Sequence, residues 1–391
     1  MMIFSAIALL TFLIWLFLIL FWGGFWRCNV ILPQGELAIS PTVCAIVPAR
    51  NEADVLPMTL RSLLQQDYPG VYSVILVDDH SSDRTAQVAQ EVAESLGKRD
   101  RLQILTSKPL PPGWTGKLWA MEQGLRQGRA LDPTPDYFFL TDADIDRDKD
   151  NLQRLVAQAQ QTRSELTSLM VLLRCKSFWE QLLIPAFVFF FQKLYPFAWV
   201  NNPQRNLAAA AGGCTLLSRQ AVDRLGGLEV IKDAIIDDCT LAQAVKKPSS
   251  EGINHQIWLG LTKSARSLRP YDSLETIWDM VARSAYAQLQ YSPLLLLGTL
   301  FGMTLVYLVP IVAIIGGIWT GNWLVLGVGM GTWLLMSGAY LPTIRFYNCW
   351  PGFALTLPAI ALFYTAMTLD SALRYYQGRG GMWKGRSYSP H

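Results

Sequence analysis

Three long stretches of this chain contain no charged side chain, and they constrain the fold more than any other feature. Residues 1–26, 284–344 and 346–369 have no Asp, Glu, Lys or Arg. About 20 apolar residues in a helix are enough to cross the hydrocarbon core of a bilayer. Soluble cores rarely sustain charge-free runs of this length. The pattern therefore predicts an N-terminal anchor helix within residues 1–26 and about three transmembrane helices within residues 292–369.

The charges beside these stretches predict an orientation. Arg27, Arg283 and Arg345 flank the predicted spans, and basic residues concentrate on the cytoplasmic side of a membrane. We therefore expect the region between the first two spans to be cytoplasmic. No basic residue precedes Arg27, which favours an anchor over a signal peptide.

The tail conflicts with this topology. Four spans would place it outside, yet residues 370–391 carry four basic residues, Arg374, Arg379, Lys384 and Arg386. Either the last apolar segment is re-entrant or interfacial, or the number of spans differs by one.

Charge and cysteine content exclude several classes of function. The formal net charge is +3, which gives no sign of nucleic-acid binding. The six cysteines form no CxxC motif and only three histidines occur, so a zinc site or a disulfide framework is disfavoured. A Ser-His-Asp triad would need His80 or His255 and is disfavoured too. Nothing in the sequence indicates a protein partner.

Residues 40–270 have the pattern of an α/β domain. Short apolar runs at 42–49, 73–79, 102–106 and 137–143 alternate with helix-like stretches such as 54–66 and 83–97. Such alternation predicts a mostly parallel, Rossmann-like sheet, whose ligands bind beyond the carboxyl ends of the strands. The segments "PARNE", "DDHSSDRT" and "TDADID" follow three of these runs. We therefore expect three polar clusters to meet at one edge of the sheet.

The acidic segment after residue 140 allows several interpretations. A calcium loop would need Gly where Arg147 stands. Asp142 and Asp144 could instead hold a divalent ion that keeps positions open for phosphate oxygens. Asp146, Asp148 and Asp150 are assigned to a solvated turn and to the cap of a helix over 151–161. No GxGxxG follows the first strand, and "TGKL" lacks the Ser or Thr of a P-loop.

Four motifs carry a resemblance to a known family. "IVPARNE", "VDDHSSDRT", "TDAD" and "IDDCTLA" resemble, in order and spacing, the GT-A glycosyltransferases of family 2. The longer segments "PLPPGWTGKLWA", "AAAAGGC" and "SLRPYDS" are similar to the hopene-associated glycosyltransferases of bacterial hopanoid clusters. The wider group includes ceramide glucosyltransferases and processive polysaccharide synthases. The resemblance implies a cytosolic GT-A domain with N- and C-terminal transmembrane helices.

The resemblance also implies how the donor would be bound. Ala49, Arg50 and Glu52 would line the nucleotide pocket, and Asp79 would accept a hydrogen bond from a uracil edge. Lys117 would face the diphosphate or the sugar, although a solvated surface lysine is the plainer interpretation. The implied donor is a UDP-sugar.

The remaining implied roles concern metal and catalysis. Asp144 would bind Mn²⁺ or Mg²⁺, and Asp142 would touch ribose or sugar hydroxyls or help hold the ion. Asp238 would be the general base, with Asp237 as a possible substitute; the plainer alternative is a helix N-terminus. Arg283 would hold the diphosphate or would only flank the membrane.

The segment "MVARSAY" departs from the (Q/R)xxRW motif of processive relatives. Met280 occupies its leading position and Ser284 replaces its Trp, which argues against chain translocation. A channel-forming polysaccharide synthase would also need more spans. A catalytically silent scaffold or transporter is disfavoured because Asp144 and Asp238 are intact.

Two aromatic segments favour a lipid acceptor. Residues 178–200 are too aromatic for a surface helix and are predicted to lie in the headgroup plane, a buried core helix being the alternative. Residues 271–291 form a second predicted interfacial segment. We expect an inverting, metal-dependent hexosyltransferase at the cytoplasmic face of a bacterial inner membrane. A hopanoid or isoprenoid acceptor is expected, with carotenoid, ceramide, diacylglycerol and polyprenyl phosphate as alternatives.

Overall fold

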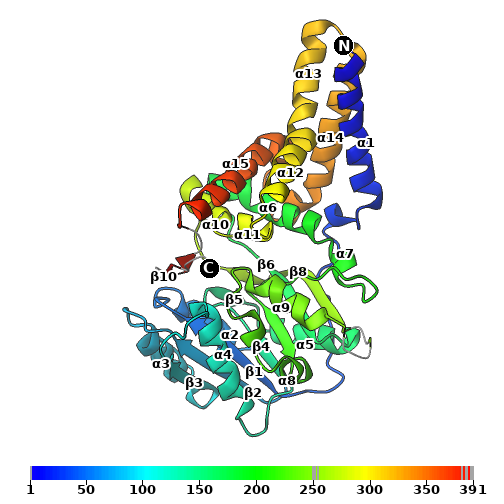
Figure 1. The fold of residues 1–391 in the computed structure, drawn as a ribbon. Helices are drawn as coiled ribbons and strands as arrows, with labels where there is room; N and C mark the ends of the chain where they lie inside the picture. Colours follow the sequence, from blue (N-terminus) through cyan, green and yellow to red (C-terminus); the bar gives the residue numbers. More distant parts are fainter. Residues whose placement is uncertain (1, 249–251, 253–254, 380–381, 384–385, 388–391) are drawn as a thin grey trace.

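The protein has two parts that stack on each other, a sheet domain and a helical part (Figure 1). The computed structural model describes residues 2–248, 252, 255–379, 382–383 and 386–387. The remaining residues of the predicted basic tail, Lys384 among them, lie outside the described residues. A core of buried side chains continues from the sheet into the helices, with Ile46 and Tyr340 among its members.

The sheet has eight strands in the order β3-β2-β1-β4-β7-β6-β8-β5. Their bounds are β1 Val43–Ala49, β2 Tyr72–Asp78, β3 Leu102–Thr106, β4 Tyr137–Leu140, β5 Ile145–Arg147, β6 Leu166–Leu172, β7 Thr215–Ser218 and β8 Ile257–Ser267. Four pairings are parallel and three are antiparallel. The predicted α/β class is confirmed, and its sheet is mixed because β7 and β5 run against their neighbours.

Helices alternate with these strands as the sequence pattern predicts. Those of the sheet domain are α2 Leu56–Leu64, α3 Thr85–Ser95, α4 Gly116–Arg129, α5 Asn151–Thr162, α8 Arg219–Leu225 and α9 Asp237–Lys246, with the short helices η2 Arg99–Arg101 and η3 Glu229–Ile231. β1, β2 and β4 are adjacent and parallel, so the segments that follow them meet at the same edge of the sheet. This edge faces the helical part (Figure 1).

The N-terminus of α5 differs in one detail from the predicted helix cap. Asp150 is its N-cap residue but makes no side-chain cap hydrogen bond. The Leu152 amide instead donates to Oε1 of Gln66, at 2.8 Å. Asp148 pairs with Arg266 at 3.0 Å. Asp150 therefore occupies the predicted cap position, but its side chain makes no cap hydrogen bond, because a glutamine distant in sequence already accepts from the helix end.

Four apolar helices of the described chain are long enough to cross a membrane: Phe4–Phe21, Pro293–Thr320, Trp323–Phe346 and Pro351–Tyr376. The helical elements of this part are α1 Met2–Phe21, η1 Phe25–Arg27, α6 Phe178–Leu194, α7 Phe197–Val200, α10 Leu274–Ala282, α11 Ala285–Gln288, α12 Pro293–Met303, η4 Thr304–Leu308, α13 Val309–Thr320, α14 Trp323–Phe346, η5 Pro351–Thr356 and α15 Leu357–Tyr376. Short strands β9 Met382–Trp383 and β10 Arg386–Ser387 follow. This agrees with the expected one N-terminal and three C-terminal apolar helices.

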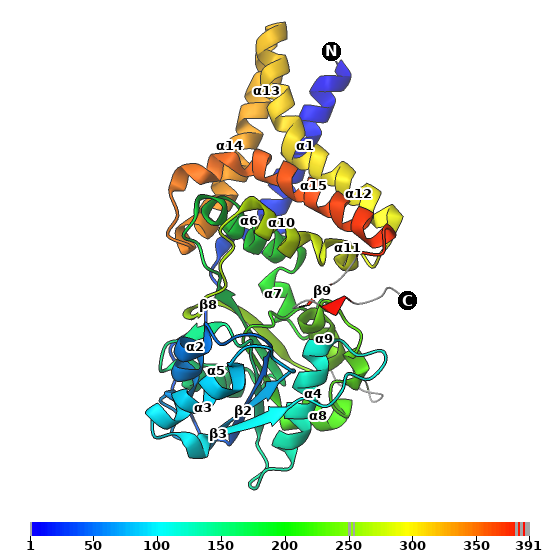
Figure 2. The same cartoon turned by 90° about the vertical axis from the view of Figure 1, so that its left-hand side faces the viewer.

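The four apolar helices are not oriented alike. α1, α13 and α14 rise together away from the sheet, whereas α15 lies obliquely across the base of this bundle (Figure 2). The C-terminal end of α15 is tied to α10: Asp370 accepts from Trp278 Nε1 at 2.7 Å, and Arg374 pairs with Asp279 at 2.6 Å. The chain after α15 therefore emerges on the side of the sheet domain.

The aromatic segment at 178–200 lies at the junction of the two parts. α6 packs against α10, α14, α15 and η1. Its N-terminus is a capping box in which Ser177 and Glu180 bond each other's backbone. Glu180 is fully buried and also accepts from the Tyr271 amide at 2.9 Å. α6 thereby connects the helices to the loop that follows β8; its position relative to the headgroups stays a prediction.

Candidate active site

The loops after β1 and β2 are fastened together at the sheet edge. Arg50 Nη1 donates to the backbone oxygen of Asp79 at 2.5 Å and lies 3.6 Å from its carboxylate. The Asn51 amide donates to Ser81 Oγ at 3.0 Å. Asn51 and His80 both have positive φ, 52° and 51°, which these residue types adopt more readily than most. Ala49 and Asp79, two predicted nucleotide-pocket residues, are buried beside this joint.

Lys117 occupies the centre of the site. Its helix, α4, begins at Gly116 after the cap Thr115, whose side chain accepts from the Leu118 amide. The Lys117 ammonium lies 3.0 Å from Asp142 Oδ1 and 3.1 Å from Asp237 Oδ2. Burial opposes the charge, but the two carboxylates outweigh it and raise the pKa of Lys117. The surface-lysine interpretation is therefore wrong.

The contact with Lys117 also changes the pKa of Asp142. Burial would raise its pKa, but Lys117 outweighs burial, with help from Arg269 and Arg147, so the pKa of Asp142 is lowered. Asp142 and Lys117 therefore form a charged pair at the end of β4. The pair is partly open, since the two side chains are 35% and 20% exposed.

Asp238 is held by backbone donors. Its Oδ2 accepts from the Gly212 amide at 2.9 Å and its Oδ1 from the Cys239 amide at 2.7 Å. Burial first, and then the negative charge of Asp237, raise the pKa of Asp238 to about 6. A carboxylate with this pKa can accept a proton near neutral pH. Lys117 lies close enough to lower the pKa slightly.

Arg269, which is not among the residues predicted from the sequence, lies in the middle of the site. It follows β8, and its Nε donates to Asp144 Oδ2 at 2.9 Å. Its Nη2 lies 3.3 Å from Glu52 Oε1. Arg269 thus joins a predicted metal ligand to a predicted nucleotide-pocket residue. Its position in the "SLRPYDS" segment, directly beyond a buried strand, is the signal that could have identified it.

Arg283 is the predicted site residue that stands apart. It caps α10, and its side chain is exposed, with no ion-pair partner among the described residues. It still lies near the cluster: burial raises the pKa of Tyr271, while Arg269 and Arg283 both oppose that rise. Arg283 therefore lies near Tyr271, at the end of α10 in the helical part.

The carboxylates of this site could supply only some of the ligands that a divalent ion requires. No group of three or more His, Cys, Asp or Glu side chains in the described residues could hold a metal. Asp142 and Asp144, the predicted ligands, already pair with Lys117 and Arg269. Mg²⁺ is commonly held by one or two carboxylates together with phosphate oxygens of a substrate. The pair thus fits an ion that arrives with a nucleotide, and does not form a complete ion site.

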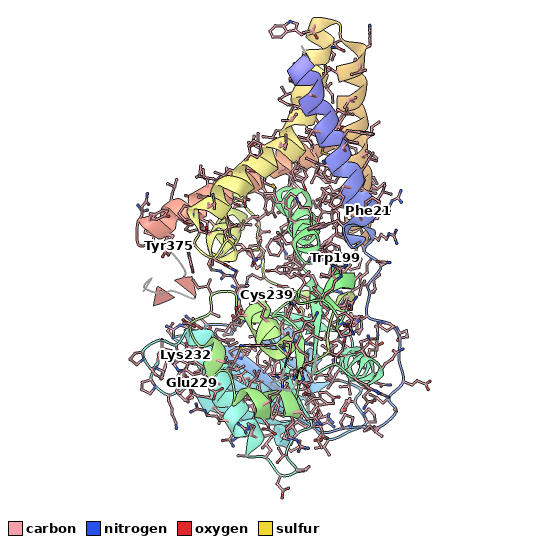
Figure 3. The ribbon with its side chains drawn as sticks, turned by 45° about the vertical axis from the view of Figure 1, so that its right-hand side comes forward. Phe21, Trp199, Glu229, Lys232, Cys239 and Tyr375 are labelled. Carbon is pink, nitrogen blue, oxygen red and sulfur yellow. The ribbon has the colours of Figure 1, made fainter. Side chains whose placement is uncertain are left out.

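The helical part forms the upper side of the site. Tyr195, the C-cap of α6, accepts from Gln288 Nε2 of α11 at 2.5 Å. Burial, and then the nearby Cys239, raise the pKa of Tyr195, and Asp238 adds to the effect. Figure 3 shows Cys239 between the sheet and the helices. The base candidate therefore faces groups supplied by α6 and α11.

Comparisons with known proteins agree with this geometry. Residues 44–226 match the model of the glycosyl transferase family 2. A mannosyltransferase of Pyrobaculum calidifontis, solved with GDP-Man and Mn²⁺, superposes with a TM-score of 0.56 at 20% identity over 95% of this chain and 98% of that one.

Two curated relatives match shorter regions. A beta-monoglucosyldiacylglycerol synthase of Trichormus variabilis is 37% identical over 93 residues, 24% of this chain and 18% of that protein. A 4,4'-diaponeurosporenoate glycosyltransferase of Staphylococcus haemolyticus is 31% identical over 126 residues, 32% of this chain and 30% of that protein. Each match spans less than a third of the relative's length. The sheet domain of this chain has the GT-A fold, and its residues 44–226 are similar to the glycosyl transferase family 2.

Proposed function

We propose that this protein is an inverting glycosyltransferase that moves a sugar from a nucleotide sugar to a hydroxyl group of a membrane lipid. The observation that carries the proposal is the Asp142–Lys117–Asp237 chain of contacts at 3.0 and 3.1 Å, beside Asp238. It sets a cation, for a leaving diphosphate, next to a carboxylate able to take up a proton. The combination serves single displacement at an anomeric carbon.

The donor would lie along the edge formed by β1, β2 and β4. Arg50, Asp79 and Glu52 border the nucleotide end in this proposal, and Lys117 and Arg269 meet the diphosphate. A UDP-sugar is the proposed donor, and a GDP-sugar is its rival because the P. calidifontis protein was solved with GDP-Man. Arg269 would exchange part of its contact with Asp144 for phosphate oxygens.

A divalent ion, Mn²⁺ or Mg²⁺, would be held by Asp144 and Asp142. Such an ion neutralises developing charge on a diphosphate. The residues of this chain do the rest: Lys117 holds the diphosphate, and Gly212 and Cys239 fix the two oxygens of Asp238. Asp238 then removes the proton of the acceptor hydroxyl. One displacement would convert an α-linked donor to a β-linked product.

The acceptor would enter from the helical part. Tyr195, which accepts a hydrogen bond from Gln288, lies near Asp238, and the four apolar helices suggest attachment to a membrane. The oblique α15, tied to α10, supports a re-entrant last segment with the tail on the side of the sheet domain. We propose that this is the cytoplasmic side of a bacterial inner membrane. The lipid is of hopanoid or isoprenoid type in our proposal, with diacylglycerol and a carotenoid as alternatives from the relatives.

The test uses the full chain purified in detergent. Radiolabelled UDP-glucose and GDP-mannose are offered with Mn²⁺ and, in separate arms, a hopanoid alcohol, diacylglycerol and total bacterial lipid. Asp238→Asn and Lys117→Met serve as inactive controls, and Lys263→Gln, at an exposed position of β8, as an active one. We expect labelled lipid from wild type and Lys263→Gln alone. No product in any arm, together with no nucleotide binding, would refute the proposal.

A further inference from the structure

Lys193 is a cation that the proposed reaction does not use. It lies near the end of α6, and its Nζ donates to Tyr307 Oη at 2.8 Å. The ammonium also lies over two aromatic rings, 5.5 Å from the centroid of Phe190 and 4.7 Å from that of Tyr307. Burial lowers the pKa of Lys193 to about 8, and no charged neighbour contributes. In the described residues no carboxylate lies within ion-pair distance of it.

The elements around α6 explain why this ammonium has no counter-charge. α1 and η4 contain no charged residue, and η1 and α14 contribute only arginines. Asp279 of α10 and Asp370 of α15 are both paired with Arg374. Glu275, the remaining acidic residue of α10, is exposed in its first turn.

The surroundings of Lys193 have the composition of a membrane interface. Trp22, directly after α1, donates its indole N–H to the Lys193 backbone oxygen at 2.9 Å. Its ring lies 4.8 Å from that of Trp199, over which Arg205 is placed at 4.4 Å. Figure 3 shows Phe21 and Trp199 close together where the helical part meets the sheet domain. Trp and Arg concentrate where a span leaves the hydrocarbon.

We propose that Lys193, held in place by Tyr307, binds the phosphate group of an anionic lipid from the leaflet that faces the sheet domain. A partly buried ammonium without a counter-ion is costly, and a phosphate beside it removes that cost. The Tyr307 hydroxyl is fully buried, accepts from Lys193 and so fixes the position of the ammonium. The partly exposed ring of Phe190 would cover the start of the acyl chains. This site lies on α6, away from the Lys117 cluster, and its lipid does not react.

The experiment measures lipid binding and does not involve sugar transfer. The full chain in neutral detergent is titrated with dioleoyl phosphatidylglycerol, with dioleoylglycerol as the phosphate-free analogue, and bound lipid is counted by native mass spectrometry. Lys193→Gln is compared with Lys263→Gln, whose lysine also lies over a ring, 5.0 Å from Phe346, but on β8. We expect Lys193→Gln to weaken phosphatidylglycerol binding about tenfold or more, and Lys263→Gln to leave it unchanged.

Three results would overturn the proposal: equal phosphatidylglycerol affinity of wild type and Lys193→Gln, equal binding of dioleoylglycerol, or displacement of the lipid by millimolar inorganic phosphate. The last would indicate a site for the free ion. If Lys193→Gln does not fold, Lys193→Arg and Tyr307→Phe replace it. The arginine is expected to keep binding and the phenylalanine to weaken it several-fold; unchanged binding in Tyr307→Phe would contradict the role of Tyr307 in positioning Lys193.

Discussion

Lys117 and Lys193 are partly buried cations in the two parts of this molecule, and their surroundings differ. Lys117, in the sheet domain, lies between two carboxylates at 3.0 and 3.1 Å, and its pKa is raised. Lys193, in the helical part, has the phenol of Tyr307 and the ring of Phe190 around it, and its pKa is lowered to about 8. The same side chain is stabilised as a cation in one place and penalised in the other.

The contrast between the two lysines indicates where a ligand from outside the chain is needed. At the sheet edge Lys117 and Arg269 each lie beside two carboxylates, so a diphosphate has to exchange with Asp142 or Asp144 for these cations. At Lys193 the described residues place no carboxylate within ion-pair distance, so an outside anion gains the whole interaction. Substitutions at the two sites should therefore have opposite effects on stability, and the following predictions test this.

The largest expected effect is at the proposed base. Asp238→Asn keeps the shape that accepts from Gly212 but cannot take up a proton. We expect kcat to fall about 10²–10⁴-fold, the usual contribution of a general base. Nucleotide binding, measured by calorimetry, should change little. Asp237→Asn should cost less, because it loses only one partner of Lys117; a greater loss in Asp237→Asn would reverse the assignment of the two roles.

The substitution Lys117→Met should have the second largest effect on activity. It removes the charge that faces the diphosphate, so we expect kcat to fall about 10²–10³-fold. It also leaves Asp142 and Asp237 close together without their shared cation. Since both are partly exposed, we expect the free energy of unfolding to fall by about 1–3 kcal/mol. Thermal unfolding with and without nucleotide measures both; unchanged stability would show that the pairing at this edge is weak.

The sequence predicted the fold well because its signals are local. Charge-free runs identified the apolar helices, and short β-branched runs such as 42–49 identified the parallel strands. The reversed strand β7 was not anticipated, because pairing direction depends on where the chain returns. The oblique course of α15 resulted from contacts of Asp370 and Arg374 with α10, which hydropathy does not encode.

The sequence predicted only part of the site, because its signals are local. Motif residues that follow strands, such as Asp142 and Glu52, did converge at one edge. Arg269 was missed because its partners Asp144 and Glu52 are 125 and 217 positions away in the chain. The acceptor at the start of α5 was missed for the same reason, since Gln66 reaches this helix end across the fold. Long-range side-chain pairs are invisible until the topology is known.

The pH dependence of transfer should report the raised pKa of Asp238. The base acts only when deprotonated, so kcat/KM should rise with pH and level off above about 6. Asp237→Asn removes a charge that raises this pKa, so the rise should move to lower pH. A profile of kcat/KM from pH 4.5 to 8.5 checks this, with Lys263→Gln as the matched variant; an unshifted profile in Asp237→Asn would contradict the coupling.

The same carboxylate predicts a small gain of stability. A carboxyl group whose pKa is higher in the folded state stabilises the fold below its unfolded pKa, and that contribution is lost as pH rises through about 6. At pH 7.5 the charged Asp238 therefore costs stability. At pH 7.5 we expect Asp238→Asn to raise the free energy of unfolding by about 1 kcal/mol, after allowance for partial exposure. The variant should therefore unfold at a slightly higher temperature at this pH. The difference should disappear at pH 4.5, where both side chains are neutral.

Lys193→Met completes the comparison with an effect opposite to that of Lys117→Met. Replacing an ammonium that lacks a carboxylate by an apolar side chain of similar length should raise the free energy of unfolding by about 1 kcal/mol in neutral detergent. Because the folded pKa of Lys193 is about 8, below the usual lysine value of 10.5, the cost of the charge is relieved as pH rises between these values. The gain in Lys193→Met should therefore shrink above pH 8. Adding phosphatidylglycerol at pH 7 should remove the gain as well, since the lipid stabilises wild type alone; a gain that persists with the lipid would show that α6 binds no phosphate.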